Sequence, residues 1–439
     1  MPLRFVFLLW FFAHDLWCYG IVPPIDSIPV YYDDILSETV TKINSGEKGV
    51  ASFVFITDTH AKTNRMQAPR LIYHILEHTN IENVIWGGDA IEAYGTAAEI
   101  EEQWQKHDLF DSLISQKGHL YKLRGNHDFT VKEKESDKGV TYSQIKTAQM
   151  LLKGHPPNIV LNSSDPGACY YYFDDKSNHL RYIVFDTTDS IKSEDVAWGT
   201  IIGVHDRQLQ WIVDSAISTI PPSYDFVFLS HIPFADARGS MLPSLKNVCE
   251  VVDAVSKKAI GKAGNVNYDF TKLKKTSVLM CLSGHKHQDT QTYRNGTVYM
   301  VTACDAAYSD FKLDPFVRDL SGRTRGTAKE QCFDCVVINR KKKLISVYRV
   351  GIGGDRFFHI KPIESKVGEH LHLKTLHKGS IEWHSYNASG NQFNKKWTLL
   401  NDVVSIDNKG TVICIKPGEA VALAMDKDGN KEFYNIIVK

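Results

Sequence analysis

Five short polar clusters in this sequence carry the side-chain types that bind transition-metal ions. Together they supply histidine, aspartate and asparagine, and each directly follows an apolar run. Imidazole and carboxylate together suit zinc, iron or manganese, whereas calcium and magnesium prefer shells made only of oxygen. The clusters are Asp58-Thr59-His60, Gly88-Asp89, Gly125-Asn126-His127-Asp128, Ser230-His231 and Gly284-His285-Lys286-His287.

The apolar runs before these clusters predict buried β-strands, because they are short and continuously apolar. In open α/β sheets, ligand sites form where the carboxyl ends of strands meet. We therefore expect the five clusters to converge on one rim. Glycine before Asp89, Asn126 and His285 permits tight turns and close backbone approach there. The runs are Phe53–Ile56, Val84–Trp86, a stretch ending at Leu123, Phe226–Leu229 and Val278–Leu282.

Such a rim would hold a pair of divalent ions whose charge attracts an anion such as phosphate. Two divalent ions against the carboxylates of Asp58 and Asp89 leave a positive site, and a hydroxide bridging the ions leaves it still attractive to phosphate. Any single cluster is weak evidence, since a lone His-x-His or a buried histidine is usually structural. It is the series of five clusters, each at a strand end, that argues for a metal site.

This series, D-x-H, GD, GNHD, H and GHxH, resembles the calcineurin-like metallophosphoesterase superfamily over roughly residues 50 to 350. The resemblance implies an α/β fold, a four-layer αββα sandwich, with two divalent ions (Mn, Fe or Zn) and a bridging hydroxide as nucleophile. His127 would be the catalytic histidine, with Asp128 orienting it. By position, Asp58, His60 and His287 would bind one ion, Asn126, His231 and His285 the other, and Asp89 would bridge them.

Details of the motifs depart from two branches of that superfamily. The first motif is D-x-H rather than D-x-G, and Glu92 rather than tyrosine stands three residues after Asp89, unlike purple acid phosphatases. GNHD rather than GNHE, and no arginine soon after Asp89, separate the chain from the protein Ser/Thr phosphatases. Six polar side chains could either contact the substrate or lie on the solvated surface, and the sequence leaves both alternatives open: Lys62, Asn64, Arg65, Arg318, Arg323 and Arg325.

The elements that must position these clusters alternate between strand and helix from residue 51 to about 230. Helical periodicity begins at Pro69 and recurs at about 97–115, 141–153 and 209–216. Strand pairs follow at about 289–302 and 333–350. Alternating βα units before a β-rich half predict two stacked sheets with helices outside, in a catalytic domain at 50–359. Residues 305–330 interrupt this pattern and are long for a connection, as functional loops often are.

A second domain is predicted at 360–439, where short alternating runs and turn signals replace helical periodicity. These 80 residues resemble a bacterial Ig-like domain of group 2, which implies a small all-β sandwich that acts as a spacer, an adhesin or a glycan-contacting module. Trp383 could be a core residue or a sugar platform, and 389–400 looks like an insertion. The matching stretches are Val367-Gly368-Glu369, Ile381-Glu382-Trp383, residues 404–407 leading into Gly410-Thr411-Val412, and Gly418 with a closing strand to Val438.

The first twenty residues read as a signal peptide. Arg4 precedes a nine-residue apolar run, Phe5–Ala13, which is too short to span a bilayer. A lipid-attachment site at Cys18 and a buried segment are the alternatives. Residues 21–49 would then be a lead-in segment, and the protein would be secreted, periplasmic or at the cell surface. Of eight cysteines, Cys281 and Cys304 look like small core residues, and the lone C-x-x-C of Cys332 and Cys335 fits neither a disulfide framework nor a zinc site.

The balance of basic and acidic residues also bears on which functions the sequence favours. The chain has 439 residues, with 51 Lys and Arg against 51 Asp and Glu. This zero net charge weighs against a nuclease, and its one dense basic run, residues 340–343, fits a solvated hairpin turn better than a phosphate-binding patch. The leading hypothesis is a secreted phosphomonoesterase or phosphodiesterase. The alternative is a non-catalytic surface protein whose metals only stabilise the fold, with glycan contacts through its C-terminal domain.

Overall fold

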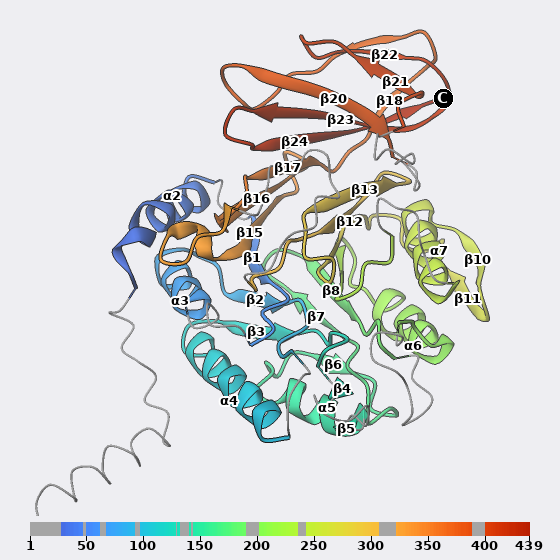
Figure 1. The fold of residues 1–439 in the computed structure, drawn as a ribbon. Coiled ribbons are helices and arrows are strands. Elements are labelled where there is room, and N and C mark those ends of the chain that lie inside the picture. The colour runs from blue at the N-terminus through green and yellow to red at the C-terminus, as the bar shows by residue number, and fades with distance from the viewer. Residues whose placement is uncertain are drawn as a thin grey trace, which may run out of the picture.

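The fold is seen in a computed structural model (Figure 1). The predicted signal peptide lies outside the described residues. Within them, no helix combines the length and apolar character needed to cross a lipid bilayer. The described residues are 28–46, 50–61, 67–92, 97–128, 130–131, 140–141, 144–189, 202–235, 243–306, 322–388 and 400–439.

The larger of two stacked sheets contains the first three predicted strands. β1, β2 and β3 run parallel, and β15 pairs with β1 in the antiparallel direction, so that Ala51 lies opposite Ile338. β18 (Ile363–Ser365) joins as a side branch on β24. The hydrogen-bonded order is β20 (Ile381–Asn387), β23 (Gly418–Asp426), β24 (Lys431–Val438), β17 (Arg356–His359), β16 (Leu344–Gly351), β15 (Cys332–Asn339), β1 (Ala51–Ile56), β2 (Asn83–Trp86) and β3 (His119–Lys122).

The second sheet packs face to face on the first. Its strands β8, β9, β12 and β14 are parallel, and β13, β7 and β6 extend it at the two sides. Phe53 and Tyr182, one from each sheet, meet edge to face in the shared core. The order is β13 (Thr290–Arg294), β14 (Thr297–Val301), β12 (Val278–Ser283), β9 (Asp225–Ser230), β8 (Leu180–Phe185), β7 (Tyr171–Asp175) and β6 (Val160–Leu161).

Helices cover the outer face of each sheet, which gives the predicted αββα layers (Figure 1). Their apolar stripes explain this, since an amphipathic helix buries one side against a sheet. α7 and the β7–β8 hairpin were not predicted from the sequence. On the first sheet lie α2 (Asp33–Asn44), α3 (Ala68–His78) and α4 (Ala97–Ile114); on the second lie α6 (Asp206–Trp211), the π-helical turn Ile212–Ile217 and α7 (Pro243–Lys257). The remaining short elements are η2 (Val30–Tyr32), α5 (Gln144–Leu152), η6 (Ala328–Glu330), and the pairs β4 (Thr130–Val131) with β5 (Val140–Thr141) and β10 (Ile260–Ala263) with β11 (Val266–Asp269).

The C-terminal region is all-β, with seven strands among its described residues, 360–388 and 400–439. It does not stand apart from the sandwich, because β24 pairs in parallel with β17 and so continues the larger sheet. A three-stranded sheet covers it, with Trp383 packed on Gly410 and near Tyr434, in agreement with a core role for that tryptophan. This second sheet is β19 (His370–His372), β22 (Thr411–Cys414) and β21 (Val404–Ile406).

The seven cysteines in the described part of the chain are all free and buried. Cys332 and Cys335 lie within β15, which has a central position in the larger sheet. Burial raises the pKa of the Cys335 thiol, so it stays protonated. These cysteines therefore behave as small core residues, as predicted for Cys281 and Cys304.

Candidate metal centre

The predicted ligands come together at the carboxyl ends of the parallel strands. Several occupy a backbone conformation that is unusual for residues with a side chain. Asp58 has φ 53°, Asp89 has φ 53° and His285 has φ 70°, and His60 and His287 are also in the left-handed region. A left-handed backbone conformation costs on the order of 1 kcal/mol or more for each such residue. Residues strained in this way are found mainly at functional sites. The strain bends the chain sharply after each strand and directs the side chains to one point.

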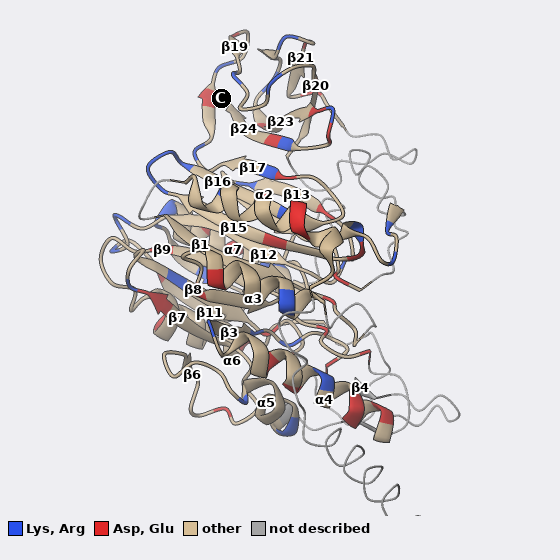
Figure 2. Ribbon diagram, turned by 90° about the vertical axis from the view of Figure 1, so that its left-hand side faces the viewer, with Lys and Arg blue, Asp and Glu red and all other residues tan. Residues whose placement is uncertain are grey.

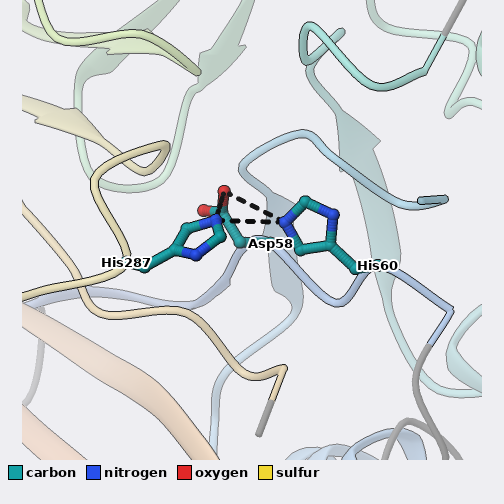
Figure 3. A group of neighbouring side chains, drawn as sticks. All are labelled: Asp58, His60 and His287. Atoms are coloured by element: carbon teal, nitrogen blue, oxygen red, sulfur yellow. Dashed lines mark hydrogen bonds and ion pairs between the residues drawn. The ribbon is translucent and has the colours of Figure 1, made fainter. Parts of the chain in front are cut away.

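The first ligand group joins the loop after β1 to the loop after β12 (Figure 3). His60 Nε2 lies 3.1 Å from His287 Nε2. The Asp58 Oδ1 atom lies 3.2 Å from His287 Nε2 and 3.8 Å from His60 Nε2. Nitrogen ligands of a tetrahedral zinc ion stand about 3.3 Å apart, given metal–nitrogen distances near 2.0–2.1 Å. These three atoms thus have the spacing of one face of a coordination shell.

The second group consists of Asp89, His231 and His285, with Asn126 beside them. His231 Nδ1 donates a hydrogen bond to the Gly87 carbonyl at 2.7 Å, which turns its Nε2 toward the site. That Nε2 is 3.1 Å from Asp89 Oδ2 and 3.2 Å from Asn126 Oδ1. Two acceptor oxygens therefore face this one nitrogen, and the arrangement needs either a proton on Nε2 or a cation between the three atoms.

Asp89 lies between the two groups. Its Oδ2 is 3.1 Å from His231 Nε2 in the second group and 3.9 Å from His60 Nε2 in the first. Its other oxygen, Oδ1, accepts a hydrogen bond from the backbone of His127 at 2.8 Å. The predicted bridging carboxylate therefore occupies a position from which one oxygen can face two ions.

The charge of the pocket also fits bound cations. Burial alone would raise the pKa of Asp58 and Asp89, but the neighbouring His231 holds the pKa of both below its usual value. Burial lowers the pKa of His231, yet the two carboxylates outweigh this and raise it to about 10. Burial and His231 lower the pKa of His285 to about 3, so it presents a neutral imidazole. The buried carboxylates thus require positive charge nearby, which divalent ions would supply.

His127 lies at the mouth of the site, and its orientation differs from the prediction. Its Nδ1 donates to the Glu92 carbonyl at 2.8 Å, so this carbonyl and not Asp128 holds the ring. Asp128 instead accepts hydrogen bonds from the backbone of Asp89, Ala90 and Gly125, at 3.0, 2.7 and 2.7 Å. Asp128 is fully buried and ties two ligand loops together. Sequence reasoning could not find this, because a main-chain carbonyl leaves no residue-type signal.

Glu92 adjoins the centre, although its carboxylate was given no role from the sequence. Its carboxylate Oε2 lies 3.8 Å from His60 Nδ1, and it forms a further group of possible ligands with His60 and His127. The side chain is 21% exposed, compared with 12% for His127 and 1% for His60. Glu92 and His127, together with the ligand His287, which is also 21% exposed, therefore lie on the solvent side of the centre.

The predicted close approach at the glycines is borne out by the spacing of the loops. A Cβ on Gly125 would lie 2.1 Å from Asp89 Oδ1, and one on Gly284 would lie 2.5 Å from Asp58 Oδ2. A Cβ on Gly88 would lie 2.6 Å from the ring of His231. The ligand loops are thus packed directly on glycine backbone, and no larger residue fits there without movement.

A buried network behind the ligands comes from the end of β8, which carries no predicted ligand. Arg124, directly before Gly125, donates to Asp186 and, at 3.1 Å, to Thr188 Oγ1. Thr187 Oγ1 accepts from the backbone N–H of Ile232, the residue after His231, at 3.1 Å. The β8 end therefore holds two ligand-bearing loops at once, each through a contact more than forty residues away in the chain.

The candidate substrate contacts are mostly outside the described residues: Lys62, Asn64, Arg65 and Arg318 fall there. Arg323 is engaged elsewhere, because it donates to the carbonyls of Cys304, Asp305 and Ala306. The backbone N–H of Ala306 in turn donates to the carbonyl of Asp58 at 3.0 Å. Arg323 thus supports a segment beside the ligands, while Arg325 is exposed.

The chain is similar to a known protein family and, more distantly, to solved structures. A model of the family described as calcineurin-like phosphoesterase matches residues 51–289. No curated protein matches the sequence. Among solved structures, GAP50 of Plasmodium, described as the anchor in the inner membrane complex, is 12% identical at a TM-score of 0.40 and covers 69% of this chain and 84% of its own. A putative 5'-nucleotidase from Staphylococcus aureus is 14% identical at a TM-score of 0.39 and covers 68% of this chain and 53% of its own.

Proposed function

This chain belongs to the calcineurin-like phosphoesterase family, and from that premise we propose that it is a secreted enzyme that hydrolyses a phosphomonoester or a phosphodiester. The observation that carries the proposal is the convergence of two ligand groups on Asp89, whose Oδ2 faces His231 on one side and His60 on the other. The groups match the donor set of a dinuclear site of zinc, iron or manganese.

The residues that would bind one ion are Asp58, His60 and His287, and those for the other are Asn126, His231 and His285, with Asp89 shared. Two divalent ions, when bound, supply Lewis-acid charge and a hydroxide nucleophile at neutral pH. Histidine binds such ions in its neutral form, with the second ring nitrogen held by a hydrogen bond. The contact between His231 Nδ1 and the Gly87 carbonyl meets that requirement.

His127 would act on the leaving group. Its Nδ1 proton is committed to the Glu92 carbonyl, so Nε2 is the nitrogen that can hold a second proton and give it to the leaving oxygen. This Nε2 lies 4.0 Å from Asp89 Oδ2, next to the bridging position. Asp128 would act only through the backbone, by fixing the loops that carry Asp89 and His127.

The test uses the mature chain from about residue 21, supplied with Mn²⁺ or Zn²⁺. Turnover of p-nitrophenyl phosphate is compared with that of bis-p-nitrophenyl phosphate, in the native chain and in Asp89→Asn and His127→Ala. We expect metal-dependent hydrolysis that Asp89→Asn abolishes along with metal binding. His127→Ala should keep its metal and lose roughly 10²–10⁴-fold in turnover.

The preferred ester decides between monoesterase and diesterase. Two bound metals per chain without turnover of either ester, or of a panel of natural phosphate esters, would instead favour the non-catalytic surface protein. Secretion is tested separately, by whether a chain that keeps residues 1–20 is exported and cut near residue 20.

A further inference from the structure

A lysine-rich surface lies at the end of the sandwich opposite the metal centre. The basic run at 340–343 forms the turn between β15 and β16, as predicted. Three further loops meet it there: 176–179, 222–225 and 271–277. Arg340 joins them, since it donates to the Asp225 carboxylate at 2.7 Å and to the carbonyls of Asn178 and Ser223. Asp225 in turn accepts from the backbone N–H of Ser277 at 2.7 Å.

The charge of these four loops is strongly one-sided. They contain eight Lys and Arg residues and one acid, Asp225, a net charge of +7 in a chain whose total is zero. Asp225 is buried and paired with Arg340, so the exposed charges are positive. Figure 2 shows blue segments on the loops along its left-hand edge, beside β7, β9 and β1, and a red segment at the end of β7. The exposed cations are Lys176, Lys272, Lys274, Lys275 and the lysines at 341–343.

The surface is far from the catalytic rim. Ala51, the first residue of β1, pairs with Ile338, whereas the ligand Asp58 follows the last residue of the strand. β9 likewise begins at Asp225 and ends just before His231. Six residues of strand separate the two ends by about 17–20 Å. These lysines therefore do not contact a phosphate bound at the metal centre.

We propose that this surface, named here the basal lysine face, binds the headgroup layer of an anionic phospholipid membrane. Lysine is a point charge on a flexible tether, which suits a diffuse anionic layer better than bidentate recognition of one group. Clusters of four to eight lysines or arginines are typical of binding to anionic lipids. The one arginine of the face, Arg340, is engaged within the protein.

Two neighbouring side chains favour a membrane over a nucleic acid. Ile260 is 71% exposed and pairs with Asp269, two residues before the 271–277 loop, so an apolar group adjoins the lysines. Asp269 is exposed too, and its carboxylate accepts two hydrogen bonds from Thr271, so it places one negative charge beside the lysines. The aromatic ring within the loops, Tyr224, stacks on His179 rather than being presented to a base. Bound in this way, the protein would turn its metal centre toward solution.

The experiment measures co-sedimentation of the full mature chain with vesicles of phosphatidylcholine alone or mixed with phosphatidylserine. We expect binding to the mixed vesicles only, and its loss at high salt. The triple variant Lys274→Ser, Lys275→Ser, Lys341→Ser should lower the partition coefficient about 100-fold. Ile260→Ser should lower it about tenfold. The control replaces three exposed lysines of the C-terminal region, Lys374, Lys378 and Lys409, with serine and should bind as the native chain does.

Thermal unfolding of each variant checks that the fold is kept. Absence of binding to mixed vesicles at low salt would overturn the proposal, as would an equal loss in the two triple variants. Tighter binding to an oligonucleotide or an acidic polypeptide, dependent on the same lysines but unaffected by Ile260→Ser, would assign the face to that polymer and exclude the membrane.

Discussion

Gly125→Ala should disable the metal centre through a single added methyl group. The Cβ would lie 2.1 Å from Asp89 Oδ1 and 2.3 Å from the Asp89 nitrogen. Ordinary van der Waals contact between such atoms begins at about 3.4 Å, so the two loops must separate by roughly 1 Å. The hydrogen bonds from His127 N to Asp89 Oδ1 and from Gly125 N to Asp128 Oδ2, at 2.8 and 2.7 Å, would be broken or stretched.

A displacement of 1 Å at a reacting centre costs about 100-fold in rate. Overpacking of a tight site also lowers the free energy of unfolding by about 1–3 kcal/mol. We therefore expect kcat/KM toward a nitrophenyl ester to fall at least 100-fold, with a lower melting temperature and less bound metal. Gly322→Ala is the matched control, because a Cβ there meets nothing within 4 Å.

The assay combines steady-state turnover at saturating Mn²⁺ or Zn²⁺, metal content by mass spectrometry and thermal unfolding. Gly125 has no left-handed φ, so backbone strain does not contribute and the steric contact alone is tested. Activity of Gly125→Ala within about threefold of the native enzyme, well short of the 100-fold loss, would refute the close packing of the two loops.

Three further predictions test the surroundings of the site. Asp186→Asn removes the charge that Arg124 binds and should lower kcat about 10–100-fold. The control is Asp174→Asn, which loosens the ion pair with Arg181 at the other end of β8 and should leave kcat unchanged. Equal effects of the two variants on kcat would mean that Asp186 is merely structural. Burial raises the pKa of Asp305 to about 7, so the folded metal-free chain loses stability as the pH rises from about 4 to about 7. Chemical denaturation should show that Asp305→Asn is more stable than the native chain by up to about 4 kcal/mol at pH 8 and equally stable at pH 4. Zn²⁺ or Mn²⁺ at 100 times its dissociation constant should stabilise the native chain by about 2.7 kcal/mol, and should stabilise Asp89→Asn by less. A melting temperature that does not change when a chelator is added would contradict the metal centre.

The polar clusters and their strands were readable from the sequence for a local reason. Each polar cluster follows an apolar run, so one short stretch of sequence indicates both the strand and the ligand at its carboxyl end. Phe53–Ile56 followed by Asp58 predicts both a buried strand and a ligand at its carboxyl end, and β1 has this form. The αββα layers followed from the same alternation of elements.

Contacts between residues that are far apart in the chain could not be predicted from the sequence. Nothing near His127 identifies the Glu92 carbonyl as its partner, and nothing near Arg124 indicates Asp186. Likewise, the run at 340–343 reads as an ordinary turn until Arg340 brings three more loops beside it. The continuation of the larger sheet through β17 and β24 was equally hidden, because sheet pairing depends on hydrogen bonds between backbones and not on residue type.

The sequence by itself therefore determined which side chains could bind metal and at which end of the strands they lie. Only the tertiary structure decided which atoms face each other, which carbonyl holds the histidine, and which charges share a surface. The physical reason is that ligand type is a property of single residues, whereas orientation and electrostatic field depend on distances between segments that only folding brings together.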